Sequence, residues 1–367
     1  MLRFRTRPYA FTCDVSMAYN GIKLRYQKYI WIEDLKPENP VKIMVVKTLI
    51  YGVKSAGNQL GVGFSKLGEH YIRFHPEHKG GAQALLKDAY DDDILHACWT
   101  RAKIEKEAES LQFILSRDGL SVKAVTYSGV PPLEIVSADQ TNIRLVGMVW
   151  NSDQDTIELD IKPLYFCKAK RGKVPELVQG DVKAAQGKVF TRRTLTGKLA
   201  GVLDPLGVLT PLTAGWKLDL RRVSMLGLDW DDKIQDSYLD TWVRNLEDIS
   251  SAKEIRFRRA VIPPSAKSTA ISIITSSDAS KNIAVACVHA RVQLQDGSYH
   301  TQLLTVISKI VNTDTIPKAE LKGAVMGASL SFTARSNLGP AMNTSLYVTD
   351  STIVLYWVNQ DQRPLQN

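Results

Sequence analysis

Three consecutive carboxylates, Asp91, Asp92 and Asp93, stand between two apolar stretches of the chain. Carboxylates this close repel one another and raise one another's pKa. A divalent cation among them would relieve the repulsion, because Mg²⁺ prefers hard oxygen ligands and keeps coordination positions free for phosphate oxygens. The alternative is a solvated acidic turn between two strands. The sequence alone therefore leaves two interpretations, a metal-binding turn and an ordinary polar one.

A second candidate metal ligand, Asp14, lies near the start of the chain. It follows the apolar run 9–13, and an aromatic residue, Tyr19, comes five positions later. Together with the motif Tyr90-x-Asp92-Asp93, this arrangement resembles the palm of a reverse transcriptase. In such palms, one aspartate follows a first strand and two more lie at a hairpin turn.

The resemblance implies a role for each of these residues. Asp14, Asp92 and Asp93 would hold two Mg²⁺ ions, and Tyr19 would reject nucleotides that carry a 2′-hydroxyl. Asp91 departs from the pattern, because the family normally has an apolar residue at that position.

Six further segments narrow the resemblance to the Pao/BEL-type LTR retrotransposon polyproteins. They follow the order of that family along nearly the whole chain: Lys47–Gln59, Leu199–Pro211, Trp230-Asp231, Ser277–Ser280, Ile316–Leu321 and Thr349–Thr352. The first of them is similar to the segment that packs under the template and the incoming nucleotide, which implies a substrate-binding role for Gln59. Lys123 stands where polymerases often place a proton donor for pyrophosphate; the alternative is a solvated lysine before a loop.

The last hundred residues have the pattern of a ribonuclease H fold. Apolar alternation and turn residues predict three strands, a helix, a strand and a helix, at 268–275, 283–294, 299–310, from Pro317 onward, at 346–348 and at 352–358. The Asp296-Gly297 pair between the second and third strands is a strong hairpin signal.

Asp278, Glu320 and Asp350 are the acidic residues of this region that we expect to bind metal. Asp278 and Asp350 end strands that should lie side by side in parallel, so their carboxylates should leave the sheet at one edge. The helix should pack with an apolar stripe inward and bring Glu320 to the same rim; the stripe is Leu321, Ala324, Val325 and Ala328. The alternative is that these acids serve only as caps or surface residues.

The length of 367 residues predicts two or three domains. We expect an α+β reverse-transcriptase palm over 1–160, with helices at 57–71 and 104–115 and a buried strand at 145–150. A basic, mostly helical thumb or connection should occupy 161–262, and an α/β ribonuclease H-like domain should occupy 263–367. Trp216, Trp230 and Trp242 are predicted to anchor the core of the middle part.

The net charge of +9 is concentrated between residues 168 and 198, where nine basic residues face two acidic ones. A basic stripe between two acidic sites suits a polyanion held by its phosphates. Arg192 and Arg193 are therefore predicted to bind an RNA–DNA hybrid. The alternative is a solvated connector without a partner.

The four cysteines lie far apart and form no C-x-x-C pair, so the spacing suggests neither a zinc site nor a disulfide framework. Reduced thiols suit an intracellular protein, cytoplasmic or nuclear. We expect no signal peptide, because the basic start of the chain lacks an apolar core, and no run is long enough for a transmembrane span.

These patterns predict an RNA-directed DNA polymerase with a ribonuclease H-like domain, each site using two Mg²⁺ ions for in-line displacement at phosphorus. The expected partners are an RNA template, a DNA primer, an RNA–DNA hybrid and deoxynucleoside triphosphates, without a membrane. We expect the fingers to be largely missing and the ribonuclease H-like domain to be truncated before its fourth acid. The alternative function is an inactive retroelement remnant that only binds nucleic acid. No Asp-Ser/Thr-Gly motif occurs, so proteolysis has no basis in the residues.

Overall fold

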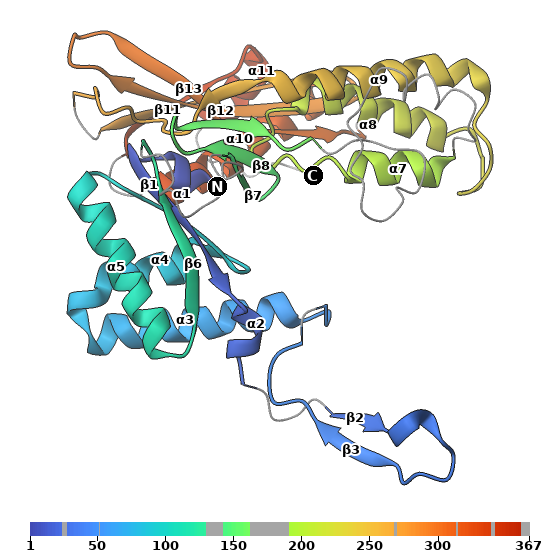
Figure 1. Cartoon of the computed structure of the whole chain (residues 1–367). Coiled ribbons are helices and arrows are strands. Elements are labelled where there is room, and N and C mark those ends of the chain that lie inside the picture. Colours follow the sequence, from blue (N-terminus) through green and yellow to red (C-terminus); the bar gives the residue numbers. More distant parts are fainter. Residues whose placement is uncertain are drawn as a thin grey trace. The chain divides into compact units, whose positions relative to one another are not determined.

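The computed structural model describes residues 1–23, 28–50, 52–129, 142–161, 191–267, 270–312, 315–338 and 342–360 (Figure 1). The chain divides into two compact units. The first unit comprises Arg3–Gln140 and Ser152–Gln154; the second comprises Met1–Leu2, Thr141–Asn151 and Asp155–Asn367. Most of the basic segment 168–198 lies outside the described residues.

Both units contain helices and strands. The helices are α1 (Leu2–Arg5), α2 (Ala18–Gly21), α3 (Ala56–Phe74), α4 (Lys79–Asp88), α5 (Arg101–Arg117), α7 (Arg192–Ala200), α8 (Thr210–Ser224), α9 (Leu239–Ser251), α10 (Ile316–Leu338) and α11 (Thr352–Asn359). The strands are β1 (Tyr9–Ser16), β2 (Lys28–Trp31), β3 (Lys42–Val45), β4 (Ala89–Tyr90), β5 (Asp93–Cys98), β6 (Ser121–Tyr127), β7 (Asn142–Leu145), β8 (Met148–Asn151), β9 (Thr156–Leu159), β10 (Arg256–Arg258), β11 (Ile271–Ala279), β12 (Ile283–Gln293), β13 (Tyr299–Ile310) and β14 (Met342–Val348). None of the described helices is long and apolar enough to span a bilayer.

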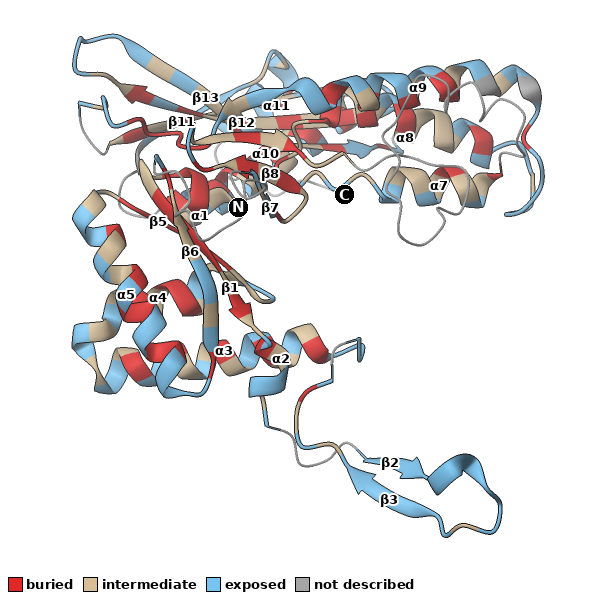
Figure 2. Ribbon diagram, viewed as in Figure 1, coloured by how far each residue is buried: buried red, intermediate tan, exposed pale blue. Residues whose placement is uncertain are grey.

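The first unit is an antiparallel sheet of order β4-β5-β1-β6 with helices α3, α4 and α5 packed against it (Figure 1). Its core is shared between the middle strand β1 and apolar residues of the three helices. Helix α5 begins at an N-cap, where the Thr100 hydroxyl accepts a hydrogen bond from the backbone N–H of Lys103, and it buries Ile104, Ala108 and Leu111. Strands β2 and β3 form a separate hairpin whose strand residues are all exposed (Figure 2).

The second unit contains a small antiparallel sheet of order β10-β9-β8-β7. Trp150 is buried on β8, and its indole N–H donates to Asp155. The guanidinium of the fully buried Arg259 donates to both carboxylate oxygens of Asp155, at 2.6 and 2.8 Å. This bidentate pair connects the chain after β10 to the β8–β9 turn.

Helices α7, α8 and α9 share one core (Figure 2). Trp216 and Trp242 are fully buried there and meet edge to face, with ring centroids 5.6 Å apart. Both tryptophans are core anchors, as the sequence predicts. The prediction is wrong for Trp230, which is 42% exposed because it stands in the loop after α8 with two arginines over its ring.

The last sheet has the order β13-β12-β11-β14, antiparallel except for the parallel pair of β11 and β14. Helix α10 connects β13 to β14, and α11 follows β14 (Figure 1). This is the order of strands and helices predicted from the sequence. The turn between β12 and β13 has Gly297 at φ 85°, and the Asp296 carboxylate accepts hydrogen bonds from Ser298.

Helix α10 packs on this sheet through small residues. The buried positions recur about once per turn and are Ala319, Gly323, Gly327, Ser331, Ala334 and Leu338. A Cβ on Gly323 would lie 3.3 Å from the backbone oxygen of Asp278, so the helix lies close against β11. The predicted stripe of larger apolar residues is wrong: Leu321 and Val325 are 37% and 58% exposed. Close backbone approach, rather than side-chain hydrophobicity, determines the buried face.

Candidate active sites

The hairpin of β4 and β5 presents the acidic run of the first unit. Asp91 and Asp92 form its turn, and Asp93 begins β5. In the antiparallel register of β1 and β5, Asp14 is directly opposite Asp93, and the backbone N–H of Val15 donates to the Asp92 carbonyl at 2.8 Å. Two chain segments that are far apart in sequence thus deliver Asp14, Asp92 and Asp93 to one end of the sheet.

The electrostatics of this end are those of crowded carboxylates. Burial first, and then the negative charges of Asp92, Asp14 and Asp91, raise the pKa of Asp93 to about 6. The Lys123 ammonium, on β6, opposes this shift and lies 2.9 Å from Asp14 Oδ1. Lys123 therefore lies in a strand, with its side chain exposed, and pairs with an acid of the site.

The carboxylates of this hairpin could hold a divalent cation, but the Lys123 ammonium would compete with the cation for Asp14. Asp14 Oδ1 is buried without a hydrogen bond of good geometry, and a hard cation prefers such a carboxylate oxygen. Lys123 already supplies positive charge at that oxygen. Asp14, Asp92 and Asp93 are not among the described groups of three whose ligand atoms lie within 4.8 Å of one another.

Asp91, which departs from the family pattern, has a local structural role. Its backbone is left-handed, at φ 50°. A Cβ added to Gly57 would lie 2.8 Å from Asp91 Oδ1, so the carboxylate lies against the first turn of α3. Negative charge at a helix N-terminus is favourable. Asp91 is thus accommodated by a helix end and a glycine.

Tyr19 and Gln59, the two predicted substrate contacts in this unit, lie on the helices α2 and α3. Tyr19 is half-buried in α2 and packs against the core. Gln59 is half-buried in the first turn of α3, and its side-chain amide donates to the Ser55 hydroxyl at 2.8 Å. Their predicted contacts with a nucleotide remain predictions.

The second unit brings Asp278, Glu320 and Asp350 together. Ser276 pairs with Val348 in the parallel register of β11 and β14, so Asp278 and Asp350 each follow two residues later at the same edge. Carboxylate oxygens of all three acids lie within 4.8 Å of one another. Glu320 reaches this edge because it follows Ala319, the first small residue with which α10 contacts the sheet.

Repulsion among these three acids acts on the middle one. Burial first, and then the charges of Asp278 and Asp350, raise the pKa of Glu320, while the backbone N–H of Ala279 opposes the shift. Asp278 and Asp350 are exposed, and Glu320 is half-buried. Three carboxylates with oxygen atoms this close form a donor set that suits Mg²⁺, with water filling the remaining positions.

Arg192 and Arg193, predicted to bind a nucleic acid, contact their own protein. Arg193 donates to both carboxylate oxygens of Asp231, at 2.6 and 2.9 Å, and Arg192 donates to the Leu228 carbonyl. Both guanidinium groups lie over the Trp230 ring, at 5.1 and 5.7 Å from its centroid. The two arginines thus connect the start of α7 to the loop after α8, and one of them is neutralised by an aspartate.

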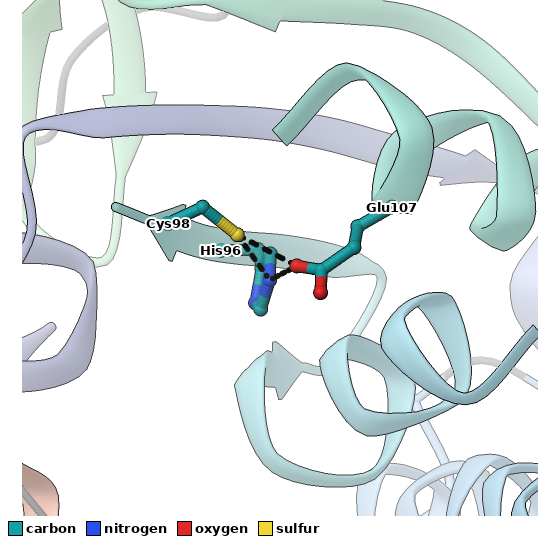
Figure 3. Close-up of side chains that lie close together, drawn as sticks. All are labelled: His96, Cys98 and Glu107. Carbon is teal, nitrogen blue, oxygen red and sulfur yellow. Dashed lines mark hydrogen bonds and ion pairs between the residues drawn. The ribbon is translucent and has the colours of Figure 1, made fainter. Parts of the chain in front are cut away.

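One cluster of possible metal ligands was not predicted from the sequence. His96 and Cys98 on β5 meet Glu107 on α5 in the core of the first unit (Figure 3). Alternation along β5 places His96 and Cys98 on one face, which is a signal the sequence contains. Nothing in the sequence indicated that Glu107, on the following helix, would face them.

Known proteins resemble this chain at two levels, in sequence and in fold. Residues 191–351 match the family model of the Pao retrotransposon-like RNaseH-like domain. A search of curated proteins gave no match. Among solved structures, a foamy viral protease-reverse transcriptase in complex with double-stranded DNA is similar, with a TM-score of 0.52 and 13% sequence identity.

The structural similarity covers 97% of this chain but 53% of the foamy viral chain, so this chain spans about half the length of that protein. At 13% identity the similarity shows the fold alone. The match over 191–351 covers the helices α7 to α9, the last sheet and all three converging acids. The resemblance drawn from the motifs is thus confirmed: residues 191–351 match the Pao retrotransposon-like RNaseH-like domain, in a chain whose fold is similar to that of a foamy viral protease-reverse transcriptase.

Proposed function

We propose that this chain is the reverse transcriptase and ribonuclease H segment of a Pao-type retrotransposon polyprotein. Residues 1–160 are the palm of an RNA-directed DNA polymerase, 161–262 the thumb or connection, and 263–367 the ribonuclease H-like domain. The substrates are an RNA template with a DNA primer and deoxynucleoside triphosphates at the first site, and an RNA–DNA hybrid at the second. The convergence of Asp278, Glu320 and Asp350 within 4.8 Å is the observation that supports this proposal best.

The chemistry at both sites is in-line displacement at phosphorus. Bound Mg²⁺ supplies a Lewis acid that stabilises negative charge on the reacting phosphate. Asp14, Asp92 and Asp93 would hold it in the palm, and Asp278, Glu320 and Asp350 would hold it in the ribonuclease H-like domain. The attacking group is the primer 3′-hydroxyl at the first site and water at the second.

The protein's own contribution at the second site is rigid placement. Parallel pairing of β11 with β14 fixes two carboxylates, and the close packing of α10 fixes the third. A site held this way needs little rearrangement when the substrate's phosphate arrives, which is how preorganised charge contributes to catalysis. Hybrid duplexes would be recognised by helix shape and 2′-hydroxyls.

Cleavage of the RNA strand of a labelled RNA–DNA hybrid, with Mg²⁺, tests the second site. We expect cleavage by the wild-type chain and its loss by at least about 100-fold in Glu320→Gln and Asp350→Asn, because each removes a carboxylate aimed at the same centre. Glu247→Gln, on the exposed side of α9, is the matched control and should keep wild-type activity. Cleavage that survives both substitutions would show that the three acids are not the site.

Primer extension on an RNA template tests the palm independently. The double variant Asp92→Asn plus Asp93→Asn should abolish extension and leave hybrid cleavage intact. Extension that persists in this variant would disprove the palm assignment. Hybrid binding without extension or cleavage in the wild-type chain would favour the alternative, a retroelement remnant that binds nucleic acid but catalyses nothing.

A further inference from the structure

A buried polar cluster lies behind the acidic hairpin of the first unit. His96 and Cys98 come from β5, Glu107 from α5 and Asp88 from the end of α4. One ring nitrogen of His96 lies 2.7 Å from Asp88 Oδ2. The other lies 2.7 Å from Glu107 Oε2 (Figure 3). The Cys98 thiol lies 3.4 Å from His96 Nε2 and 2.6 Å from Glu107 Oε2. His96 is 6% exposed and Cys98 1%, so water contributes little to this network.

The contact between His96 Nδ1 and Asp88 sets the orientation of the His96 ring. Its Nδ1 faces Asp88, which also pairs with Arg3 at 2.5 Å, and this leaves Nε2 directed at Cys98 and Glu107. A histidine that donates one ring N–H to a carboxylate and directs its other nitrogen at further donors has the arrangement found around protein-bound zinc. Asp88 is thus placed to orient a ligand rather than to be one.

Of the three spacings between the converging donor atoms, one already suits a tetrahedral metal, and the two that involve Glu107 are shorter. With metal–nitrogen, metal–oxygen and metal–sulfur distances of about 2.0 to 2.3 Å, neighbouring ligand atoms lie about 3.3 to 3.6 Å apart. The nitrogen and sulfur atoms, at 3.4 Å, already meet this spacing. Glu107 Oε2 must withdraw by less than about 1 Å from both to make room for an ion of this size.

The space for that movement is present. A cavity of about 500 Å³ is lined by Glu107 together with Gly80, Thr100, Lys103 and Ser110. A Cβ on Gly80 would lie 2.4 Å from the Glu107 side chain, so glycine at this position is what makes room for that side chain. The cavity thus gives solvent access to Glu107.

The charges of the cluster balance in either state. Both nitrogens of His96 face carboxylate oxygens, an arrangement that favours the doubly protonated, positively charged ring beside Asp88 and Glu107. Binding a divalent ion would release one proton from His96 Nε2 and one from Cys98 Sγ to solvent. Two positive charges leave and two arrive, so the buried net charge is unchanged. Exchange of this kind adds no uncompensated charge to the core.

We propose that His96, Cys98 and Glu107 form a binding site for zinc or a similar borderline-soft divalent ion, with Asp88 orienting His96. A nitrogen, sulfur and oxygen set selects such ions over Mg²⁺, which prefers oxygen ligands alone. The bound ion would fix α5 to β5, the strand that begins with Asp93. The site is independent of the catalytic roles proposed above.

Cobalt titration of the full chain tests the site, because a Co²⁺–thiolate bond gives a charge-transfer absorption that Mg²⁺ sites do not produce. The chain has four cysteines, so a triple variant, Cys13→Ser, Cys167→Ser and Cys287→Ser, leaves Cys98 as the sole thiol. We expect the band in the wild-type chain and in the triple variant, and its loss in Cys98→Ser. Zinc should displace the cobalt and raise the melting temperature, since a ligand that binds only the folded state stabilises it.

Two further results separate a metal site from a hydrogen-bonded polar core. Asp88→Asn should weaken cobalt binding by about 10- to 100-fold while the band remains at saturation, as loss of an orienting carboxylate does. Asp92→Asn plus Asp93→Asn should leave the titration unchanged. Absence of the band in the wild-type chain or in the triple variant would overturn the proposal and leave the cluster a polar core only. Persistence of the band in Cys98→Ser would also overturn it.

Discussion

Replacement of Asp93 by asparagine should stabilise the chain at neutral pH when no divalent ion is present. Burial and the neighbouring carboxylates raise the pKa of Asp93 from 3.8 to about 6. Its ionised form is therefore disfavoured in the folded state, and at neutral pH this lowers the free energy of unfolding. The full difference in pKa corresponds to about 3 kcal/mol. Asp93 is only partly buried, and solvent screening reduces the expected gain to about 1 to 2 kcal/mol.

The sign of the pH dependence follows from proton binding. Between about pH 4 and pH 6 the folded state holds more protons at Asp93 than the unfolded state, so wild-type stability falls as the pH rises through this window. The asparagine side chain of the variant does not titrate. The advantage of Asp93→Asn should therefore be absent below about pH 4, grow up to about pH 6 and stay constant above it.

Urea unfolding with a chelator present, at several pH values, measures this effect. Asp153→Asn, an exposed aspartate of the same unit, is the matched control and should change stability by less than about 0.5 kcal/mol. Added Mg²⁺ should stabilise the wild-type chain more than the variant if Asp93 is a ligand. A variant no more stable than wild type at neutral pH, or an advantage that does not shrink on acidification, would refute the electrostatic reasoning.

Three other predictions concern packing and binding. Gly207→Ala should destabilise the chain by more than about 3 kcal/mol, because Gly207 has φ +74° and its Cβ would lie 1.9 Å from the Val306 carbonyl oxygen. Urea unfolding measures this loss. The control is Gly215→Ala, in open space on α8, which should be neutral or stabilising. Arg259→Met should lower the free energy of unfolding by about 3 kcal/mol because it leaves Asp155 without its bidentate partner, whereas Arg258→Met, at an exposed position, should change it little. Replacing Arg192 and Arg193 with Ala should weaken hybrid binding and flatten its salt dependence if phosphates compete for these side chains, and an unchanged slope in a filter-binding titration would assign them to the Trp230 contact alone.

Local signals carried most of what the sequence predicted. Period-2 alternation and the Asp296-Gly297 turn define the β12–β13 hairpin, and strand order then brings Asp278 beside Asp350. The buried face of α10 was mispredicted because hydrophobicity ranks Leu321 above Gly323, whereas the packed face needs small residues for close approach. Trp230 was mispredicted because an amphipathic ring can be covered by arginines instead of by a core.

Side-chain contacts between segments that are distant in the sequence could not be predicted from it. The ion pair of Lys123 with Asp14 depends on β6 lying beside β1, and 109 positions separate the two residues. The cluster of His96 with Glu107 depends on how α5 settles on β5. Both contacts result from the packing of elements on one another. The type and position of a residue in the sequence do not predict which partner it meets there.

The loop before α8 hydrogen-bonds to the outer strand β13 of the last sheet, and this contact bears on aggregation. The backbone N–H of Val306, in the middle of β13, donates to the Leu206 carbonyl, and the Asp204 carboxylate accepts from the backbone N–H groups of Val208 and Leu209. Strand β13 is an outer strand of its sheet, and an outer strand with free hydrogen-bonding groups is a template for aggregation. The Leu199–Pro211 segment thus covers part of this outer strand. A fragment beginning at residue 263 would lack that cover, and we expect it to self-associate more readily.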